Sequence, residues 1–389
     1  MSITISEAVK YIGVDDKTID LFESQYVVPN GVSYNSYLIL DEKVALLDTV
    51  DARGMEQWEK NLMEALGGRK VDYLIVDHLE PDHAGSIGRL VELFPEVTLV
   101  GNAKTFQMLP QFFDLDLEGH TLTVKEGDTL SLGAHTLSFY MAPMVHWPEV
   151  MVTYESSEKI LFSADGFGKF GALDYDDPEG WACEARRYYF NIVGKYGAPV
   201  QALLKKAAGL DIQTICPLHG PVLNENLGYY IGLYDTWSSY KPEDKGVLVA
   251  YASIHGNTAK AAEKFAEMLR AKGVEKVSVM DLSRDDMAEV IEDAFRYDRM
   301  VLAAASYDGG VFPCMQDFLH HLQSKAFQNR TVGIIENGSW APTAAKTMKG
   351  ILETLKNVTV LEPTVTIRST MKDSDLAAME ALADAVANA

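Results

Sequence analysis

Cysteine is scarce in this chain. Its 389 residues include three cysteines, Cys183, Cys216 and Cys314, and these lie far apart in the sequence. Such a small and scattered set excludes a disulfide framework, and without a C-x-x-C pair the cysteines provide no iron–sulfur ligand set. The chemistry of the protein is therefore expected to come from side chains of other types.

Long apolar runs and basic runs are also missing. The apolar segments are far too short to span a bilayer. The first ten residues, M-S-I-T-I-S-E-A-V-K, lack the basic stretch and apolar core of a signal peptide. Lys and Arg total 34 against 56 Asp and Glu, which gives a formal charge of −22. We therefore expect a soluble cytoplasmic protein that binds neither nucleic acid nor membranes.

Two regions of the chain differ in their pattern of strands and helices. Residues 1–242 contain many short strands and then strands with helices, which predicts two sheets flanked by helices. Residues 246–389 alternate strictly between strand and helix, and five such strands predict a doubly wound parallel sheet. The polar segment Tyr240–Lys245, which contains Pro242, is typical of a linker. The chain is thus predicted to be an α/β protein with two domains.

Some elements can be placed more closely. The apolar spacing from Met55 to Leu66 predicts a helix, and the glycine pair Gly67-Gly68 is expected to end it. The other expected elements are strands at 32–40 and 43–50, joined by a turn at Asp41 and Glu42, helices at 85–93 and 105–113, and a fifth strand of the second region at 359–367.

The most informative pattern is a set of imidazoles and carboxylates that follow strand-like segments. Part of the set falls within V-D-H-L-E-P-D-H-A-G, directly after the apolar run V-D-Y-L-I-V, and the rest within M-V-H-W, F-S-A-D-G and P-L-H-G-P. Side chains of these types can hold two metal ions about 3–4 Å apart, with one carboxylate as the bridge. The residues are His78, Glu80, Asp82, His83, His146, Asp165 and His219.

Glu80 indicates which metal the site would hold. An H-x-H-x-D-H run would give a nitrogen-rich site suited to zinc hydrolysis, but here a glutamate takes the place of the second histidine. Anionic oxygen favours the higher oxidation state of a redox metal, and mixed imidazole and carboxylate sets suit iron. We interpret the pattern as a redox di-iron site.

These residues also have less specific interpretations. A lone H-x-E in a loop is usually polar surface, but several ligand-type residues clustered after a buried strand favour a metal site. Asp77 either lies behind a metal ligand or simply ends its strand. Cys216 precedes His219 by three positions, yet a small buried apolar residue is the preferred interpretation. The histidines interpreted as ordinary surface or packing residues are His120, His135, His320 and His321.

Three loops of the second region predict another site, at the carboxyl edge of the sheet, where doubly wound sheets bind ligands. The first loop can cradle a phosphate at a helix N-terminus, although it could be only a helix cap. The other two combine glycines with Tyr307 and Trp340, which could stack on a planar ring or could be packing residues. We interpret the three loops as a site for FMN. They comprise Ser253, Ile254, His255, Gly256, Asn257, Thr258, Ser306, Tyr307, Asp308, Gly309, Gly310, Asn337, Gly338, Ser339 and Trp340.

With both sites present, the whole chain resembles the flavodiiron proteins (A-type flavoproteins), a family of oxygen and nitric oxide reductases. In that family a metallo-β-lactamase-like αββα sandwich precedes a flavodoxin-like doubly wound parallel sheet. The pattern H-x-E-x-D-H…H…D…H matches the family at each position, and P-N-G-V-S-Y-N-S-Y-L is similar to its N-terminal region. The resemblance implies domains at 1–242 and 246–389.

The resemblance also implies a role for each ligand-type residue. His78, Glu80 and His146 would bind one iron, Asp82, His83 and His219 would bind the other, and Asp165 would bridge them. Tyr26 and Trp147 could line the iron pocket or could belong to the core.

The implied activity is reductive. Electrons would pass from FMN to the di-iron centre, which would reduce O₂ to water or NO to N₂O, and the sequence leaves both gases open. The family implies a head-to-tail homodimer, or a dimer of dimers, in which each FMN faces the irons of the partner. Because the chain has no C-x-x-C pair, we expect an external electron donor such as rubredoxin or reduced coenzyme F420.

Two rival functions belong to other classes. A binuclear zinc hydrolase of the metallo-β-lactamase type would share the fold and most of the ligand positions, but Glu80 and the flavin loops argue against it. A non-enzymatic electron carrier with a vestigial metal domain would have an incomplete ligand set, whereas this set is complete.

Overall fold

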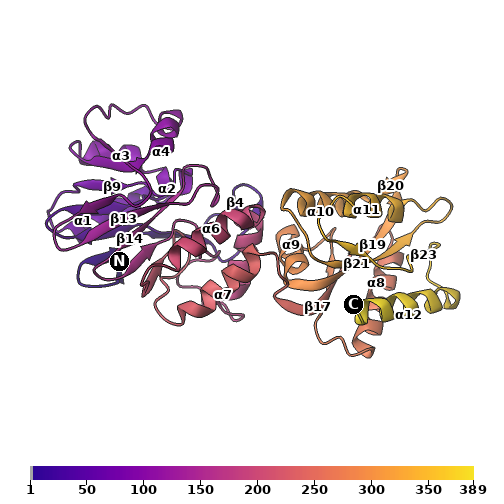
Figure 1. Cartoon of the computed structure of the whole chain (residues 1–389). Coiled ribbons are helices and arrows are strands. Elements are labelled where there is room, and N and C mark those ends of the chain that lie inside the picture. Colours follow the sequence, from indigo (N-terminus) through magenta and orange to yellow (C-terminus); the bar gives the residue numbers. More distant parts are fainter. Residues whose placement is uncertain (1–2) are drawn as a thin grey trace. The chain divides into compact units, whose positions relative to one another are not determined.

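The computed structural model describes residues 3–389, which form two compact units. The first unit contains the chain up to Tyr189 together with Ala198–Asp235, and the second contains Phe190–Gly197 and Thr236–Ala389 (Figure 1). No helix within residues 3–389 is long and apolar enough to cross a membrane.

Two sheets form the framework of the first unit. One sheet runs, in spatial order, β1 (Ile3–Thr4), β2 (Val9–Tyr11), β7 (Tyr37–Leu40), β8 (Val44–Leu47), β9 (Tyr73–Ile75), β10 (Thr98–Asn102) and β11 (Thr121–Val124). The other runs β12 (Thr129–Ser131), β13 (Thr136–Met141), β14 (Met151–Glu155), β15 (Ile160–Phe162) and β16 (Thr214–Cys216). Two small pairs complete the set: β3 (Val14–Asp16) with β6 (Val32–Tyr34), and β4 (Leu21–Phe22) with β5 (Tyr26–Val27).

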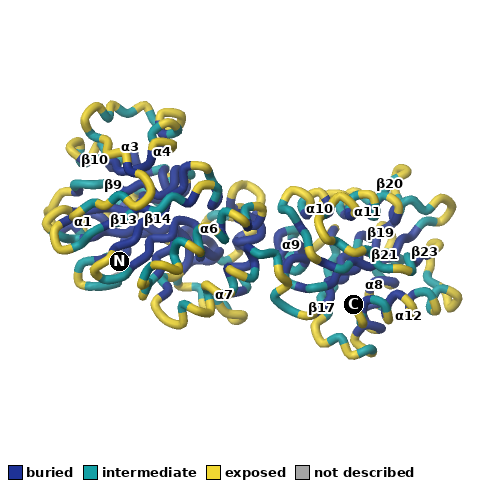
Figure 2. The backbone as a smooth tube through the Cα atoms, viewed as in Figure 1, coloured by how far each residue is buried: buried dark blue, intermediate teal, exposed yellow. Residues whose placement is uncertain are grey.

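The core of the first unit joins these two sheets. Ile39 and Ile75 of the first sheet belong to the same buried cluster as Phe139 and Phe162 of the second. Cys216 lies in this cluster too, as its apolar interpretation predicted. Burial of apolar surface is the main force that holds such a sandwich together, and Figure 2 shows both sheets as predominantly buried backbone. Because apolar side chains fill the space between the sheets, the polar loops lie at the ends of the strands.

The helices that lie wholly in the first unit are α1 (Met55–Leu66), α2 (Pro81–Ala84), α3 (Ile87–Leu93), α4 (Ala103–Met108) and α5 (Trp181–Tyr188). Helices α6 (Gly197–Ala207) and α7 (Leu227–Ser238) lie mostly in it, but Gly197 and the last residues of α7 belong to the second unit. Helix α1 buries Trp58 and Leu62, and the indole nitrogen of Trp58 donates to Oγ of Ser36 at 3.0 Å. The predicted bounds of α1 are confirmed, because Gly67 ends it in the left-handed conformation with φ of +56°.

A parallel sheet forms the second unit. Its strands, in spatial order, are β18 (Val277–Asp281), β17 (Asp244–Ala252), β19 (Tyr297–Tyr307), β21 (Thr331–Asn337) and β22 (Thr359–Val360), with β23 (Val365–Ile367) also paired to β21 and β20 (Gly310–Val311) antiparallel to β19. This is the doubly wound order for which flavodoxin is the standard example, with the switch point between β17 and β19. The switch point is where a ligand is expected.

Helices cover both faces of this sheet. Helices α8 (Asn257–Ala271) and α12 (Asp373–Ala387) share one buried cluster with the strands, through Phe265 and Leu382 among others. Helices α9 (Met287–Arg296), α10 (Pro313–Ser324) and α11 (Ala344–Leu352) pack side by side on the other face. The α/β architecture predicted for this region is therefore present.

Four predicted elements differ from the structure. The strand expected at 32–40 is interrupted at Asn35 and Ser36, because Asn35 turns away to bond another loop. The helix expected at 85–93 begins at Ile87, as α3, and a separate helix, α2, precedes it because Pro81 already starts a turn there. The helix expected at 105–113 begins at Ala103 and gives way at Leu109–Gln111 to a 3₁₀ turn, because Pro110 cannot continue α-helical bonding. The expected fifth strand is split into β22 and β23 around Pro363, which has no N–H for a strand ladder.

The segment predicted as a linker is bonded within the second unit. Oη of Tyr240 donates to the carbonyl oxygen of Gly194 at 2.9 Å, and the guanidinium of Arg330 donates to the carbonyl oxygen of Tyr240 at 2.8 Å. Strand β17 already starts at Asp244. These residues therefore form part of the packed unit instead of a free connection.

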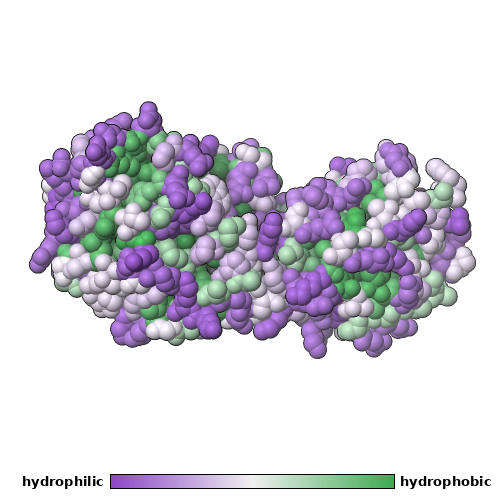
Figure 3. Space-filling model, turned by 45° about the horizontal axis from the view of Figure 1, so that its top comes forward, coloured by the Kyte–Doolittle hydropathy of each residue, from purple (hydrophilic) through white to green (hydrophobic). Residues whose placement is uncertain are grey.

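Large apolar side chains are exposed at a few places. Leu21 and Val27 are exposed on the β4–β5 pair of the first unit, and Tyr307 and Trp340 lie on loops of the second. Trp340 stands out with 89% of its surface exposed. On the face that Figure 3 shows, hydrophilic side chains are spread over each unit, and apolar side chains are exposed among them.

Candidate metal centre and ligand pocket

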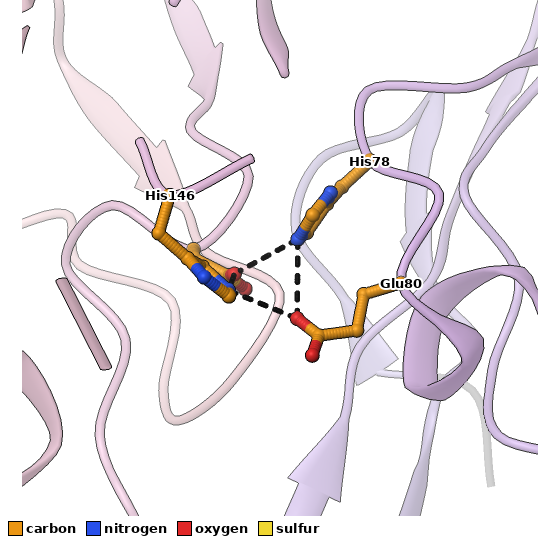
Figure 4. Close-up of side chains that lie close together, drawn as sticks. His78, Glu80 and His146 are labelled. Carbon is orange, nitrogen blue, oxygen red and sulfur yellow. Dashed lines mark hydrogen bonds and ion pairs between the residues drawn. The ribbon is translucent and has the colours of Figure 1, made fainter. Parts of the chain in front are cut away.

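One group of ligand-type side chains consists of His78, Glu80, His146 and Asp165, and we call it the first group. Figure 4 shows the rings of His78 and His146 and the carboxylate of Glu80 pointing toward one another. Oε2 of Glu80 lies 2.9 Å from Nε2 of His146 and 3.3 Å from Nε2 of His78. Oδ2 of Asp165 lies 3.1 Å and 3.3 Å from the same two nitrogens. Their ligand atoms all lie within 4.8 Å of one another, so this group could hold a metal ion.

The second group consists of Asp82, His83 and His219. Oδ2 of Asp82 lies 3.1 Å from Nε2 of His219 and 3.3 Å from Nε2 of His83. All three side chains are buried, and their ligand atoms also fall within 4.8 Å of one another. This group could hold another metal ion.

Asp165 faces both groups. Its Oδ2 points to the first group, while its Oδ1 lies 3.1 Å from Nε2 of His83 and 3.9 Å from Nε2 of His219. Two oxygens of one carboxylate thus serve two neighbouring sites. The structure brings all seven ligand-type residues together in this arrangement.

Unsatisfied buried atoms show that a metal pair fits here. Both carboxylate oxygens of Asp82 and of Asp165, and Nε2 of His78, His83 and His219, are buried without a hydrogen-bond partner among the described residues. Leaving buried polar atoms unpaired costs stability, and two cations would satisfy these oxygens and nitrogens together. The donor set, mixed imidazole and carboxylate, suits iron.

The electrostatics of the first group favour positive charge between its members. Burial by itself raises the pKa of Glu80, but the neighbouring imidazoles of His146 and His78 outweigh it and hold that pKa below the usual range. Burial by itself lowers the pKa of His146, yet the neighbouring carboxylates of Asp165 and Glu80 raise it to about 9. Protons and metal ions compete for such atoms, so metal binding here will release protons.

The ends of strands position these side chains. His78 and Glu80 follow β9, and Asp82 and His83 lie in the short helix α2 that comes next. The remaining three, His146, Asp165 and His219, follow β13, β15 and β16. Because these strands come from both sheets, the site forms only where the two sheets meet at one edge.

A segment near the N-terminus holds His219 in place. Nδ1 of His219 lies 2.6 Å from the carbonyl oxygen of Ser33, and the backbone N–H of Gly220 donates to Oγ of Ser33 at 2.7 Å. The side-chain amide of Asn35 donates to the carbonyl oxygens of Pro217 and Gly220. This explains the V-S-Y-N-S-Y-L motif, whose role could not be derived from the sequence.

Buried acids hold the loop that carries His78. Oδ1 of Asp48 accepts the backbone N–H groups of Asp77 and His78, at 3.0 Å and 3.2 Å. Oδ1 of Asp77 accepts the hydroxyl of Thr153, so Asp77 supports the loop and does not merely end a strand. Oε1 of Glu149 lies 2.8 Å from Nδ1 of His78. Sequence reasoning missed Asp48 and Glu149, although Glu149 follows His146 by only three positions.

Aromatic rings surround both groups. Trp147 packs edge-on against His78, with ring centroids 5.4 Å apart, and Phe22 packs edge-on against His219 at the same distance. Tyr26 is buried and its ring lies 6.2 Å from that of Phe170. Of the two residues left open above, Trp147 contacts the cluster, whereas Tyr26 packs in the apolar wall behind it.

The second unit contains a cavity of about 620 Å³ at the carboxyl edge of its sheet. Its walls come from the three loops expected to bind FMN, except that Gly256 and Gly310 do not line it. Gly256 instead provides the turn before α8, with φ of +83°. Sequence reasoning missed four lining residues, which lie beside or beyond those loops: Ala305, Ala341, Thr343 and Ser369.

Hydrogen bonds within the protein join the loops that form the walls of this cavity. The side chain of Asn337 accepts from the backbone N–H of Ser369 at 2.9 Å and donates to its carbonyl oxygen at 2.8 Å. Oγ of Ser306 accepts the backbone N–H groups of Thr343 and Ala344, at 2.8 Å and 3.1 Å. Ser306 and Asn337, which were predicted as flavin contacts, line the cavity, and their side chains also hold its loops together.

Comparisons with known proteins agree with the fold of both units. The ODP family beta lactamase model matches residues 32–220, and a flavodoxin domain model matches residues 248–369. An uncharacterized protein of Methanocaldococcus jannaschii is 30% identical over 380 residues, which cover 97% of this chain and 95% of that protein. The nitric oxide reductase of Moorella thermoacetica is 29% identical, with 96% of this chain and 95% of that protein covered.

Solved structures agree as well. The rubredoxin oxygen:oxidoreductase of Desulfovibrio gigas has a TM-score of 0.92 and 25% identity, with 100% of this chain and 98% of that chain covered. The flavodiiron protein of Giardia intestinalis has a TM-score of 0.90 and 24% identity, with 100% and 96% covered, and shows likeness in fold.

A β-lactamase-like domain with two ligand groups, followed by a flavodoxin domain with an open cavity, defines a two-cofactor oxidoreductase. The chain belongs to the flavodiiron protein family. Its cofactors are accordingly FMN and a di-iron centre, and the predictions of family, fold class, oxidoreductase activity and cofactors are confirmed.

Proposed function

We propose that this flavodiiron protein reduces O₂ to water, NO to N₂O, or both, with electrons that an external donor delivers through FMN. The observation that carries the proposal is the pair of imidazole and carboxylate groups that share Asp165. When bound, FMN would take up electrons from the donor and the iron pair would supply two of them at a time to the gas.

Seven side chains would hold the irons under this proposal. One iron would be held by His78, Glu80 and His146, the other by Asp82, His83 and His219, and Asp165 would bridge the two. The distances between their ligand atoms support this assignment.

The residues of the site would also control charge and water. Imidazole neighbours keep the pKa of Glu80 and of Asp165 below the usual range, against the raising effect of burial on both. Both carboxylates would thus be available as anionic oxygens at neutral pH. The aromatic wall formed by Phe22 and Trp147 would limit access of water to the pocket, and no side chain is required as a nucleophile.

In the second unit the FMN phosphate would lie at the loop Ser253–Thr258, beside the start of α8. The flavin ring would lie beside Tyr307 and Trp340, which line the cavity and are exposed without it. We further propose domain boundaries at 1–242 and 246–389, and the two matched family regions support them.

Assembly and partners follow from the family. A head-to-tail homodimer or dimer of dimers would bring each FMN to the irons of the partner subunit. Rubredoxin or reduced coenzyme F420 is the proposed donor, and the name of the Desulfovibrio gigas relative supports the first of these. A cytoplasmic location is proposed because three cysteines that lie far apart in the sequence do not make a disulfide framework.

A zinc hydrolase of the metallo-β-lactamase type is less well supported. Glu80 gives the first group more anionic oxygen than zinc hydrolysis favours, and a hydrolase has no use for the flavin cavity.

The test uses the full chain, purified anaerobically, supplied with Fe(II) and FMN and reduced by rubredoxin or a chemical donor. O₂ and NO electrodes then follow the loss of each gas. Rapid O₂ loss without peroxide would establish an oxygen reductase, and rapid NO loss a nitric oxide reductase. If neither gas is consumed while the protein binds zinc and cleaves an ester or lactam, the hydrolase is the correct function.

A further inference from the structure

We propose that Glu149 is a positioning residue of the metal centre. It holds the ring of His78 through Nδ1, so that Nε2 faces Glu80 and Asp165, and it ties the loop of His78 to the loop of His146. This inference rests on the metal role proposed above for His78.

The hydrogen bond fixes which nitrogen of His78 is free. Oε1 of Glu149 lies 2.8 Å from Nδ1 of His78, and both side chains are completely buried. The backbone N–H of Leu79 lies 2.9 Å from the same oxygen and 3.1 Å from Nδ1 of His78. An ionised carboxylate can only accept hydrogen bonds, so the proton in the shorter contact between Nδ1 and Oε1 belongs to the imidazole. Nδ1 therefore carries the proton, and the lone pair of Nε2 is left to point at the metal position.

Glu149 also connects the two sheets at the site. It lies three residues after His146, in the loop that follows β13 of the second sheet, whereas His78 follows β9 of the first sheet. The backbone of Glu149 is itself fixed, because the side-chain amide of Asn102 donates to its carbonyl oxygen at 2.5 Å. Two members of the first group are thereby held to one another through a single buried carboxylate.

The second group has a different support. Nδ1 of His219 faces the backbone carbonyl oxygen of Ser33 at 2.6 Å, a neutral acceptor that no side-chain substitution removes. Hydrogen bonds to a charged acceptor are roughly twice as strong as those to a neutral one. Substitution of Glu149 should therefore affect the metal position beside His78 and spare the one beside His219.

A purely structural role explains less of what is seen. Glu149 could serve only to satisfy the N–H of Leu79, but a backbone carbonyl or a water would do this at lower cost. Its second oxygen, Oε2, is buried without a hydrogen-bond partner among residues 3–389. A completely buried and half-satisfied carboxylate destabilises a fold, so its presence beside an imidazole requires another function.

The test is an anaerobic titration of the metal-free full chain with Fe(II), followed by Mössbauer spectroscopy of the ferrous protein. Wild type, Glu149→Ala and Glu149→Gln are compared with the control Glu155→Gln. Glu155 is also completely buried and accepts two backbone N–H groups, from Ser157 and Glu158, but it lies at the other end of β14.

We expect Glu149→Ala to weaken the binding of one of the two irons by about 10- to 100-fold and to leave the other unchanged. Glu149→Gln retains an acceptor oxygen without the charge, so it should keep both irons and shift the Mössbauer doublet of one only. Glu155→Gln should match wild type in both measurements. If circular dichroism shows that Glu149→Ala is unfolded, the Mössbauer doublets of Glu149→Gln test the inference by themselves.

Two outcomes would overturn the inference while leaving the proposed function intact. In one, both Glu149 variants bind two irons with the wild-type affinity and doublets. In the other, both irons weaken equally, which would indicate general loosening of the fold. A wild-type chain that binds fewer than two irons would instead count against the proposed function itself.

Discussion

Oγ of Ser306 accepts a hydrogen bond from the backbone N–H of Thr343 at 2.8 Å. It also accepts the N–H of Ala344, the first residue of α11, at 3.1 Å. The first N–H groups of a helix have no partner within the helix, and no side chain at the start of α11 caps it. A hydroxyl at the carboxyl end of β19 thus acts as the cap of a distant helix and joins two walls of the flavin cavity.

Removal of this hydroxyl should destabilise the second unit. We expect Ser306→Ala to lower the stability of the FMN-free protein by about 1 kcal/mol, the usual cost of losing a helix cap. Thermal unfolding followed by circular dichroism measures this. Ser339→Ala is the matched control, because Ser339 lines the same cavity and its hydroxyl bonds that of Ser369, away from any helix start. Equal melting temperatures for Ser306→Ala and wild type would contradict the capping role.

Substitution at Asp165 should disable the metal centre. Its two oxygens serve different groups, and asparagine offers only one oxygen, without charge. We expect Asp165→Asn to bind fewer than two irons per chain. The rate of gas consumption should fall by more than about 100-fold, because even residues that only support a metal ligand usually cost about 10- to 100-fold when they are substituted. Iron analysis and electrode assays test this, with the exposed Asp211→Asn as the control. Full iron content in Asp165→Asn would argue against a bridge.

Trp340 should contribute to the binding of FMN. It lines the cavity with 89% of its surface exposed, so a flavin could cover it. Aromatic stacking contributes about 0.5–1.5 kcal/mol beyond burial, so Trp340→Ala should raise the Kd for FMN about 3- to 10-fold, and Trp340→Phe should raise it less. Quenching of FMN fluorescence gives the Kd. Tyr229→Ala, which removes an exposed aromatic of the first unit, should leave it unchanged. An unaltered Kd for Trp340→Ala would exclude stacking.

The positions of the seven ligand-type residues could be predicted because each follows a strand or its adjoining turn. Strand ends gather at the edges of sheets, and short-range signals such as V-D-H-L-E-P-D-H mark them. The start of α2 could also have been found, since Pro81 is favoured at the first position of a helix. Both inferences use only neighbouring residues.

The supporting residues could not be predicted, because their contacts join distant parts of the chain. Ser33 meets His219 across 186 positions, and Glu149 meets His78 across 71. Such pairs depend on how the two sheets are registered, for which a single sequence gives no local signal. The same reason applies to the hydrogen bond between Ser306 and the start of α11, which joins residues 38 positions apart.

His135 should make stability depend on pH in the first unit. Its ring nitrogens lie 2.8 Å from Oδ2 of Asp41 and 3.1 Å from Oε1 of Glu158. Burial by itself lowers the pKa of His135, but hydrogen bonds to these two carboxylates raise it above the ordinary 6.5. A group whose pKa is raised by folding stabilises the fold fully below its unfolded pKa, and this contribution is lost as the pH rises through the folded value.

We therefore expect His135→Gln to be less stable than wild type at pH 5.5, and this difference to shrink toward zero above the raised pKa. Because the ring is partly solvent-screened, the difference at low pH should stay below about 1 kcal/mol. Melting temperatures of both proteins across pH 5.5–9 test this. His120→Gln is the control, because the ring of His120 makes no ion pair with any residue from 3 to 389. A difference for His135→Gln that grows with rising pH would show that the protonated ring does not stabilise the fold.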